Sequence, residues 1–515
     1  MDGTPGTLAT SEAHFGRRKS DAAAALADAR LHRSAWRELV RTLCDRLEQA
    51  QLEFAWIDDA RDASSHAALV RGSVAFVEPW LASCAEALAL AMPRVPQGTA
   101  GRVRICTSLA PDAVRAALAG LSDLRESSVW IARGDPAREQ LADSLNFQSV
   151  EFLGSPQRPA QDAVSSLFAP GALELAALRG ADVLRLLSCA RAFAVSLGDA
   201  ADSSDETGPF ALGALLAGMA ARGAGQVHLS FPPALRALEH WIEFAAGLLP
   251  AESRIGIFGG EPLAQATAYG NDRWLIDCRF DAQTQTPALS ARAHRLVAAG
   301  VPMLQLALPA RDALVGELVR WDLALGFAAE LTKSNWPRAR LAHAASAFLT
   351  SLGEPALRQP PLSLFAAPAH AHVLRKVAGT LGTAAQGSVP HWLAAHLALA
   401  EPGDFVALHF SALGTEKNRE ALSSLQTALG AASRVPVRAM FSLPGRSPDD
   451  ATPARLLDCA ATSSRGLYLL LDDEDERTLV ALASAGRRVV LLRAVDGEPT
   501  ALFSTLGAAA ELLAR

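Results

Sequence analysis

The sequence predicts an α/β protein whose parallel sheets are covered by helices on both faces. Short apolar runs rich in β-branched residues alternate with longer runs of helical period along most of its 515 residues. Such alternation is typical of βαβ units, which build parallel sheets. Half of the residues are apolar and a fifth are charged, so a large core is expected and global disorder is not. The length indicates two or three domains.

The first part of the chain predicts a tail followed by helices. Residues 1–33 are mostly Gly, Ser, Ala and charged residues, and we expect a flexible N-terminal tail there. From residue 34 onward, apolar residues recur at steps of three and four, which predicts an amphipathic helix: Trp36, Leu39, Leu43 and Leu47. Strand-like runs follow at 102–109, 128–132 and 149–153. We therefore place a first α/β domain with N-terminal helices at 34–205.

An acidic, apolar-poor segment at 199–208 separates this part from a second α/β domain, which we place at 206–350. Its strand-like runs lie at 226–231, 254–258, 273–280 and 302–308. Residues 351–390 are rich in Pro, Gly and Ala, and we expect a long connection there. A C-terminal α/β segment at 391–515 follows, with strand-like runs at 404–410, 435–441, 466–471 and 488–493 and a last helix at 500–515.

Charge and composition exclude several classes of function. The formal net charge is −6, with no basic stripe for nucleic acid and no polybasic segment for a membrane surface. No apolar stretch reaches the roughly 18 to 20 residues of a spanning helix, and no signal segment is visible near the N-terminus. The six cysteines are far apart and form no CxxC pair, so buried free thiols are expected. We expect a cytoplasmic protein with no nucleic-acid or membrane partner.

Several short motifs recur in an order and spacing that resemble one known family. They are Gly-Glu-Pro-Leu at 260–263, Ala-Tyr-Gly-Asn-Asp-Arg at 268–273, Gly-Glu-Leu-Val-Arg-Trp-Asp at 316–322, Pro-Gly-Asp-Phe-Val-Ala-Leu at 402–408 and Gly-Arg-Arg-Val-Val at 486–490. Together they resemble the phosphoglucose isomerase family, in particular the isomerase half of bacterial transaldolase/glucose-6-phosphate isomerase fusions. The resemblance implies two flavodoxin-like sugar-isomerase (SIS) domains with parallel sheets, a C-terminal α/β segment, a sugar-phosphate ligand and a homodimer.

The same resemblance supplies candidate phosphate-binding and charge-stabilising residues. The family's glycine-rich phosphate turn corresponds to 104–108, where Thr107 and Ser108 remain as hydroxyl ligands but the glycines are missing. The resemblance implies Arg158 as a displaced equivalent of the arginine that stabilises the enediolate in that family. The plainer interpretations are an ordinary strand–helix turn at 104–108 and a surface arginine at 158.

The candidate general base depends on the alignment. Direct counting from Trp241 puts Leu248 at the base position, which would abolish proton transfer. An alternative alignment matches Ala-Glu-Ser at 251–253 and makes Glu252 the base, whereas a solvated loop glutamate is the plainer interpretation. The family's late His/Lys loop corresponds to 442–450, where no His, Lys or Gln is present.

These losses predict a pseudoenzyme, a structural or regulatory protein that binds a sugar phosphate or another protein. The alternative is a divergent aldose–ketose isomerase acting on glucose 6-phosphate and fructose 6-phosphate or a related sugar phosphate. We expect no cofactor and no metal. Four histidines cluster in the sequence, but their spacing is poor for zinc, so core or surface roles are favoured: His370, His372, His391 and His396.

Overall fold

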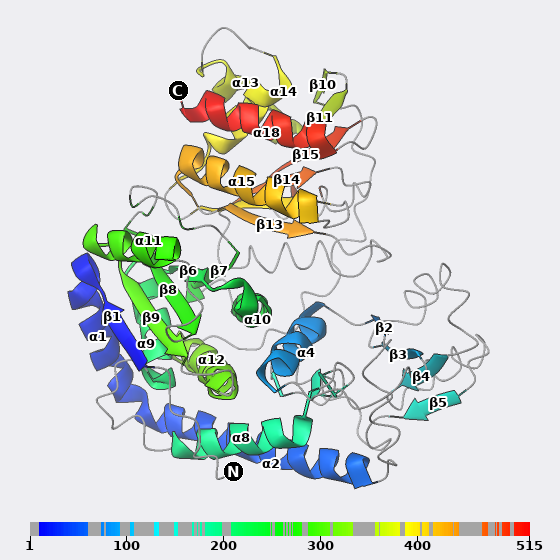
Figure 1. The fold of residues 1–515 in the computed structure, drawn as a ribbon. Helices are drawn as coiled ribbons and strands as arrows, with labels where there is room; N and C mark the ends of the chain where they lie inside the picture. Colours follow the sequence, from blue (N-terminus) through cyan, green and yellow to red (C-terminus); the bar gives the residue numbers. More distant parts are fainter. Residues whose placement is uncertain are drawn as a thin grey trace.

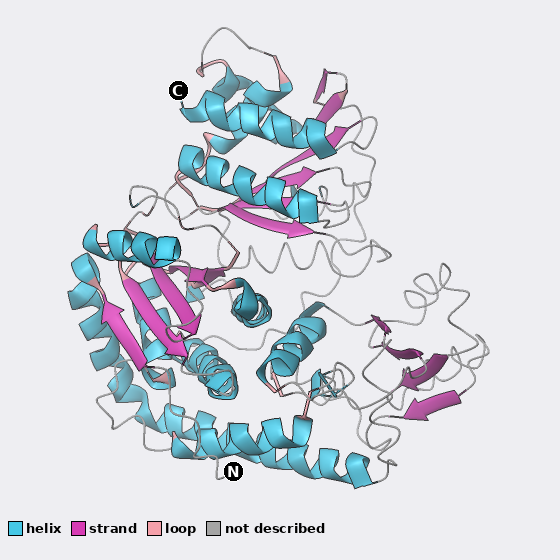
Figure 2. Cartoon of the chain, viewed as in Figure 1, coloured by secondary structure: helices cyan, strands magenta, loops and turns pink. Residues whose placement is uncertain are grey.

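The computed structural model describes residues 10–59, 74–76, 79–92, 103–107, 128–132, 149–152, 181–197, 208–247, 253–260, 271–280, 287–308, 313–332, 356–359, 361–381, 387–401, 404–410, 416–435, 437–441, 466–471, 487–494 and 499–514, with single positions between these ranges (Figure 1). The described strands form three sheets, and helices pack on the middle and C-terminal sheets (Figure 2). The predicted α/β class with parallel sheets is confirmed.

The N-terminal sheet has four parallel strands in the order β2-β3-β4-β5. Their bounds are β2 Val74–Phe76, β3 Val103–Thr107, β4 Ser128–Ala132 and β5 Ser149–Phe152. The last three match the strand-like runs of the sequence. The helices described in this part of the chain are α2 (Arg33–Asp59), α4 (Pro79–Ala91) and α8 (Val183–Ser196).

The middle sheet has five strands in the order β1-β9-β8-β6-β7. Four are parallel: β6 (Gln226–Ser230), β7 (Gly256–Phe258), β8 (Arg273–Phe280) and β9 (Met303–Leu308). Numbered along the chain, they lie in the spatial order 2-1-3-4, which is the flavodoxin-like arrangement. The helices of this part are α9 (Pro209–Ala221), α10 (Arg236–Gly247), α11 (Pro287–Ala298) and α12 (Leu314–Leu331).

Side chains of β8 alternate between the two faces of the middle sheet, as the period of a strand requires. Trp274, Ile276 and Cys278 join the large core that contains α9 and α12. Leu275 joins a smaller cluster with Ala293 and the rest of the apolar face of α11. Helices therefore cover both faces, which explains the uninterrupted apolar run at 274–276.

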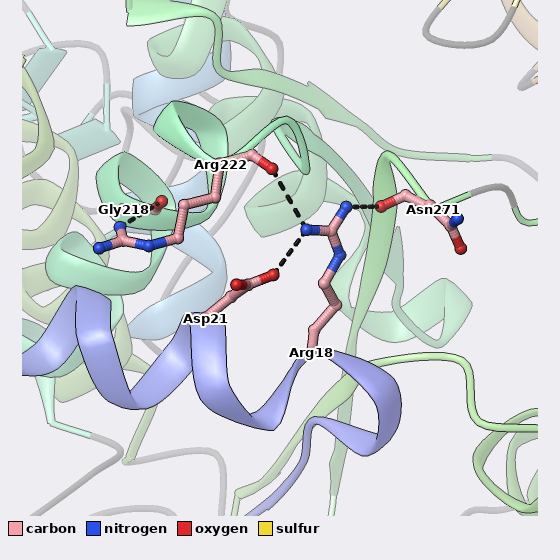
Figure 3. Close-up of polar contacts among 5 residues, drawn as sticks. All are labelled: Arg18, Asp21, Gly218, Arg222 and Asn271. Carbon is pink, nitrogen blue, oxygen red and sulfur yellow. Dashed lines mark hydrogen bonds and ion pairs between the residues drawn. The ribbon is translucent and has the colours of Figure 1, made fainter.

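The expectation of a flexible tail at 1–33 is wrong for the residues that the structure describes there. β1 (Thr10–His14) pairs antiparallel with β9 at the edge of the middle sheet, and α1 (Lys19–Ala29) packs on α9. Arg18 connects the start of α1 to the middle sheet region. Its guanidinium donates to the carboxylate of Asp21 and to the carbonyl oxygens of Arg222 and Asn271 (Figure 3). Ordering here depends on partners roughly 200 to 290 residues away, which local composition does not reveal.

One apolar core extends from Phe15 to Ala329 and crosses the predicted domain boundary at 205/206. At its centre lies α12, whose residues are buried on every side. It packs on α9 so closely that a Cβ on Gly213 would lie 2.7 Å from the carbonyl oxygen of Ala324. It also contacts α2, α4 and α8. The helices of 34–205 therefore share their core with the second α/β region.

The C-terminal sheet has six strands in the order β10-β11-β15-β14-β12-β13. The strands are β10 Leu357–Gln359, β11 Leu362–Ala366, β12 Val406–Phe410, β13 Val437–Phe441, β14 Leu467–Leu471 and β15 Arg488–Ala494, and the helices are α13 Pro368–Ala378, α14 Val389–Leu397, α15 Glu416–Ser433 and α18 Pro499–Ala514. β10, β11 and α13 lie within 351–390. That range is therefore not a plain connection, because it supplies the edge strand β10 and its antiparallel neighbour β11.

Phe258 at the end of β7 joins the middle sheet to the C-terminal sheet. Its ring lies 5.4 Å from that of Phe405, within a cluster that also holds Tyr468. The guanidinium of Arg273 donates to the carbonyl oxygen of Arg434 over 3.4 Å. The two sheets thus share side-chain packing and a hydrogen bond.

The close contact between α1 and α9 gives a test of the ordered N-terminal region. A Cβ on Gly218 would lie 2.9 Å from the Cα of Ala25, so Gly218→Ala should push α1 away and lower the free energy of unfolding by about 1–3 kcal/mol. Gly507 of α18 has no neighbour within 4 Å, so Gly507→Ala should be neutral or stabilising. Denaturant unfolding measures both. Equal effects of the two substitutions would contradict the docking of α1.

Candidate functional site

The order of strands in the middle sheet indicates where a ligand would bind. In flavodoxin-like sheets the chain reverses its direction of winding between the first and third strands, and ligands bind outside the carboxyl ends of strands there. In this protein that position lies between β6 and β8. The residues at the carboxyl ends of β6, β7 and β8 are therefore the first place to examine, and we call them the crevice.

Polar side chains that bind one another lie in the crevice between β6 and β8. Ser230 and Asp277 are register partners, and the Asp277 carboxylate accepts hydrogen bonds from Arg279 and from the side chains of Ser230 and Gln305. Burial raises the pKa of Asp277, and the hydrogen bond and charge of Arg279 act against this rise. These groups satisfy one another within the protein.

Two carboxyl groups from α10 occupy the backbone donors at the end of β7. Glu239 and Glu243 are four residues apart and so lie on one face of the helix. The N–H of Gly260 donates to Oε1 of Glu239 over 3.0 Å, and the N–H of Gly259 donates to Oε1 of Glu243 over 3.4 Å. Glu239 also bonds to the backbone of Phe231, just after β6.

Burial raises the pKa of Glu239 to about 8, opposed by the hydrogen bond from Gly260 and reinforced by the neighbouring Glu243. This carboxyl is therefore mostly protonated at neutral pH. A pKa in this range suits proton transfer near pH 7, which makes Glu239 the most chemically distinctive group of the crevice. It is not among the residues predicted from the sequence. The sequence did contain one signal for it, because Glu239 and Glu243 are an acidic pair four residues apart on an amphipathic helix that follows a strand.

Of the site residues predicted from the sequence, only Thr107 lies within the described structure. Thr107 ends β3, where its backbone pairs with Phe76. Ser108, Arg158 and Glu252 lie outside the described residues, so their roles stay predictions. Ser253 is described and buried, and it precedes β7, at the amino end of that strand.

The motifs that carry the family resemblance contribute mainly to packing in the described structure. Gly260 adopts a left-handed φ of +72° and supplies its N–H to Glu239. Leu263 is buried in the cluster beneath α11. Glu317 and Arg320 of the 316–322 motif form a fully buried ion pair of 3.5 Å inside α12. The motif residues in α12 thus define the core rather than a surface crevice.

Of the four histidines clustered in the sequence, His391 and His396 are buried, His370 is partly buried and His372 is exposed. Nε2 of His370 lies 2.9 Å from Nδ1 of His396, and a ring nitrogen of His391 lies 2.7 Å from the carbonyl oxygen of Ala378. Burial lowers the pKa of His370 to about 4 and that of His396 well below its usual range. Among the described residues, no group of three or more His, Cys, Asp or Glu side chains is arranged to hold a metal ion.

No protein-family model matches the chain, and no curated protein matches it. Solved structures that resemble it include a hypothetical protein of Thermus thermophilus, at 16% identity over 64% of this chain and 96% of that one, with a TM-score of 0.39. A glucose-6-phosphate isomerase from Chlamydia trachomatis matches at 12% identity over 58% of this chain and 70% of its own, with a TM-score of 0.34. The C-terminal domain of a glucosamine-fructose-6-phosphate aminotransferase from Francisella tularensis matches at 7% identity over 58% and 96%, with a TM-score of 0.33.

These likenesses are distant, and the fold assignment rests on the strand order of the middle sheet. None of the described helices is both long enough and apolar enough to cross a bilayer.

The raised pKa of Glu239 predicts a pH-dependent stability. Between its ordinary value of 4.5 and about 8, the folded protein holds one proton more than the unfolded chain at this site. The free energy of unfolding should therefore fall as pH rises through this interval, by at most about 1.4 kcal/mol per pH unit from this group. In Glu239→Gln that contribution is absent.

Urea unfolding at pH 5, 6, 7 and 8 tests this prediction. Glu239→Gln should gain stability relative to the unsubstituted protein as pH increases, whatever its stability at pH 5. Parallel curves for the two proteins would contradict the burial of an ionisable group at this position.

Proposed function

We propose that this chain is a sugar-isomerase-like protein that no longer catalyses isomerisation and acts as a structural or regulatory subunit. One observation carries the proposal. The backbone N–H groups that follow β7, which could cradle a phosphate, donate instead to the carboxyl groups of Glu239 and Glu243. An incoming phosphate would have to displace buried carboxyls of the protein itself.

The sequence supports the same proposal from another direction. Residues 442–450 contain none of the His, Lys and Gln side chains of the family's loop, and the turn at 104–108 has no glycine for close approach to phosphate. Loss of a single catalytic group costs roughly 10² to 10⁴ in rate, so several losses together leave little catalysis by this mechanism. The crevice then serves to bind a sugar phosphate or a protein, including a second copy of this chain.

A divergent aldose–ketose isomerase is the second candidate function. The specific observation in its favour is the pKa of about 8 for Glu239, which suits a group that moves a proton at neutral pH. Glu252, which the family resemblance implies as the base, is the alternative carrier of that step. The two functions predict opposite results in one assay.

A coupled assay of the interconversion of glucose 6-phosphate and fructose 6-phosphate, run in both directions, decides between them. We expect turnover below about 10⁻³ s⁻¹, roughly 10⁴-fold under an ordinary enzyme. Turnover at ordinary rates that is lost in Glu252→Gln or Glu239→Gln would overturn the proposal and identify the base. A thermal-shift titration with both sugar phosphates accompanies the assay, and stabilisation without turnover would support a binding role.

A further inference from the structure

A cavity lies at the amino ends of the strands of the middle sheet, at the end opposite the crevice. It has a volume of about 470 Å³ and is lined by the last turns of α1 and α12, by α9 from Ala214 onward and by the residues that lead into β7. Its floor consists of buried alanines from two helices: Ala25, Ala29, Ala214 and Ala217. This volume is within the range of roughly 300–1,000 Å³ that is typical of small-molecule sites.

The backbone at Arg254, on the rim of this cavity, is held in an unusual conformation. Its φ of +56° lies in the left-handed region, which non-glycine residues rarely adopt. Gly225 permits this turn, because a Cβ there would overlap the carbonyl group of Arg254, and the N–H of Gly256 donates to Gly225 over 2.9 Å. The N–H of Ile255 also donates to the hydroxyl of Ser253. The turn presents the exposed Arg254 guanidinium at the rim.

The facing rim carries both signs of charge. The Arg222 guanidinium donates to the carbonyl oxygen of Gly218 over 2.9 Å and to the carboxylate of Asp28 over 2.6 Å. Arg18 binds the carbonyl oxygen of Arg222 and so fixes the end of α9, as Figure 3 shows. Three helix C-termini also meet here, and their dipoles favour positive charge.

We propose that this cavity binds a small α-amino acid with an apolar side chain. The alanine floor receives the side chain, and the Arg254 guanidinium receives the carboxylate. The ammonium group lies near Asp28, whose carboxylate can accept further hydrogen bonds beside that from Arg222. The carboxylate and the ammonium group of such a ligand would each meet a group of opposite charge on the rim. This inference goes beyond the proposed function and does not depend on it.

Titration calorimetry on the full chain tests the ligand class. The probes are L-leucine, 4-methylpentanoate, which lacks the ammonium group, and 3-methylbutylamine, which lacks the carboxylate. We expect L-leucine to bind and each analogue to bind at least about tenfold more weakly. The proposal is overturned if leucine shows no binding up to about 20 mM, if an analogue binds equally well, or if inorganic phosphate competes with leucine.

A matched pair of variants locates the site. Arg254→Gly removes the rim guanidinium and relieves the left-handed backbone, and Arg434→Gly does the same at a φ of +58° away from the cavity. The melting temperatures of both variants should lie within about 3 °C of that of the unsubstituted protein. Only Arg254→Gly should lose at least about tenfold in leucine affinity. Unchanged affinity in Arg254→Gly, or an equal loss in Arg434→Gly, would overturn the assignment.

Discussion

The burial of α12 on all sides is the constraint on which the middle of the molecule depends. Because the helix is buried along nearly all of its length, the charged side chains of Glu317, Arg320 and Asp322 lie away from water and need partners within the protein. Glu317 and Arg320 pair within the helix, and burial raises the pKa of Asp322 to about 7, opposed by the charge of Arg46. Removing one member of a buried pair typically costs about 3–5 kcal/mol, so this arrangement restricts which sequences can fill the helix. The packing of α2, α4, α8 and α9 follows from it.

The sequence was a good guide wherever structure depends on local pattern. The predicted strands of the middle and C-terminal sheets coincide with β6 to β9 and β12 to β15, because runs of β-branched and apolar residues bury both faces of a parallel sheet. It was a poor guide at the edges of the sheets. β1 reads as polar tail, and β10 reads as connection, since each is an edge strand whose backbone pairs on one side only.

For the candidate site, too, the sequence was a guide to short motifs but not to environments formed by distant parts of the chain. The family resemblance predicted phosphate-binding residues in the turn at 104–108 and a general base at 251–253. Burial raises the pKa of Glu239, against the hydrogen bond that its carboxyl accepts from the N–H of Gly260, 21 residues further along the chain. No short window of sequence contains that environment. The same holds for the cavity beside Arg254, which draws its lining from three helices separated by up to roughly 300 residues.

The pairing of β1 with β9 also has a consequence for the order in which the molecule can be made. Thr10 leaves the ribosome roughly 290 residues before Met303, so at about 5–20 residues per second β1 exists for roughly 15–60 s before β9 is synthesised. During this interval it is an unpaired strand. Its sequence, Thr-Ser-Glu-Ala-His, is short and polar, which makes it a poor template for aggregation. The pairing of β1 at this edge of the middle sheet can therefore form only after β9 has been synthesised. Until then the polar sequence of β1 suits exposure to solvent.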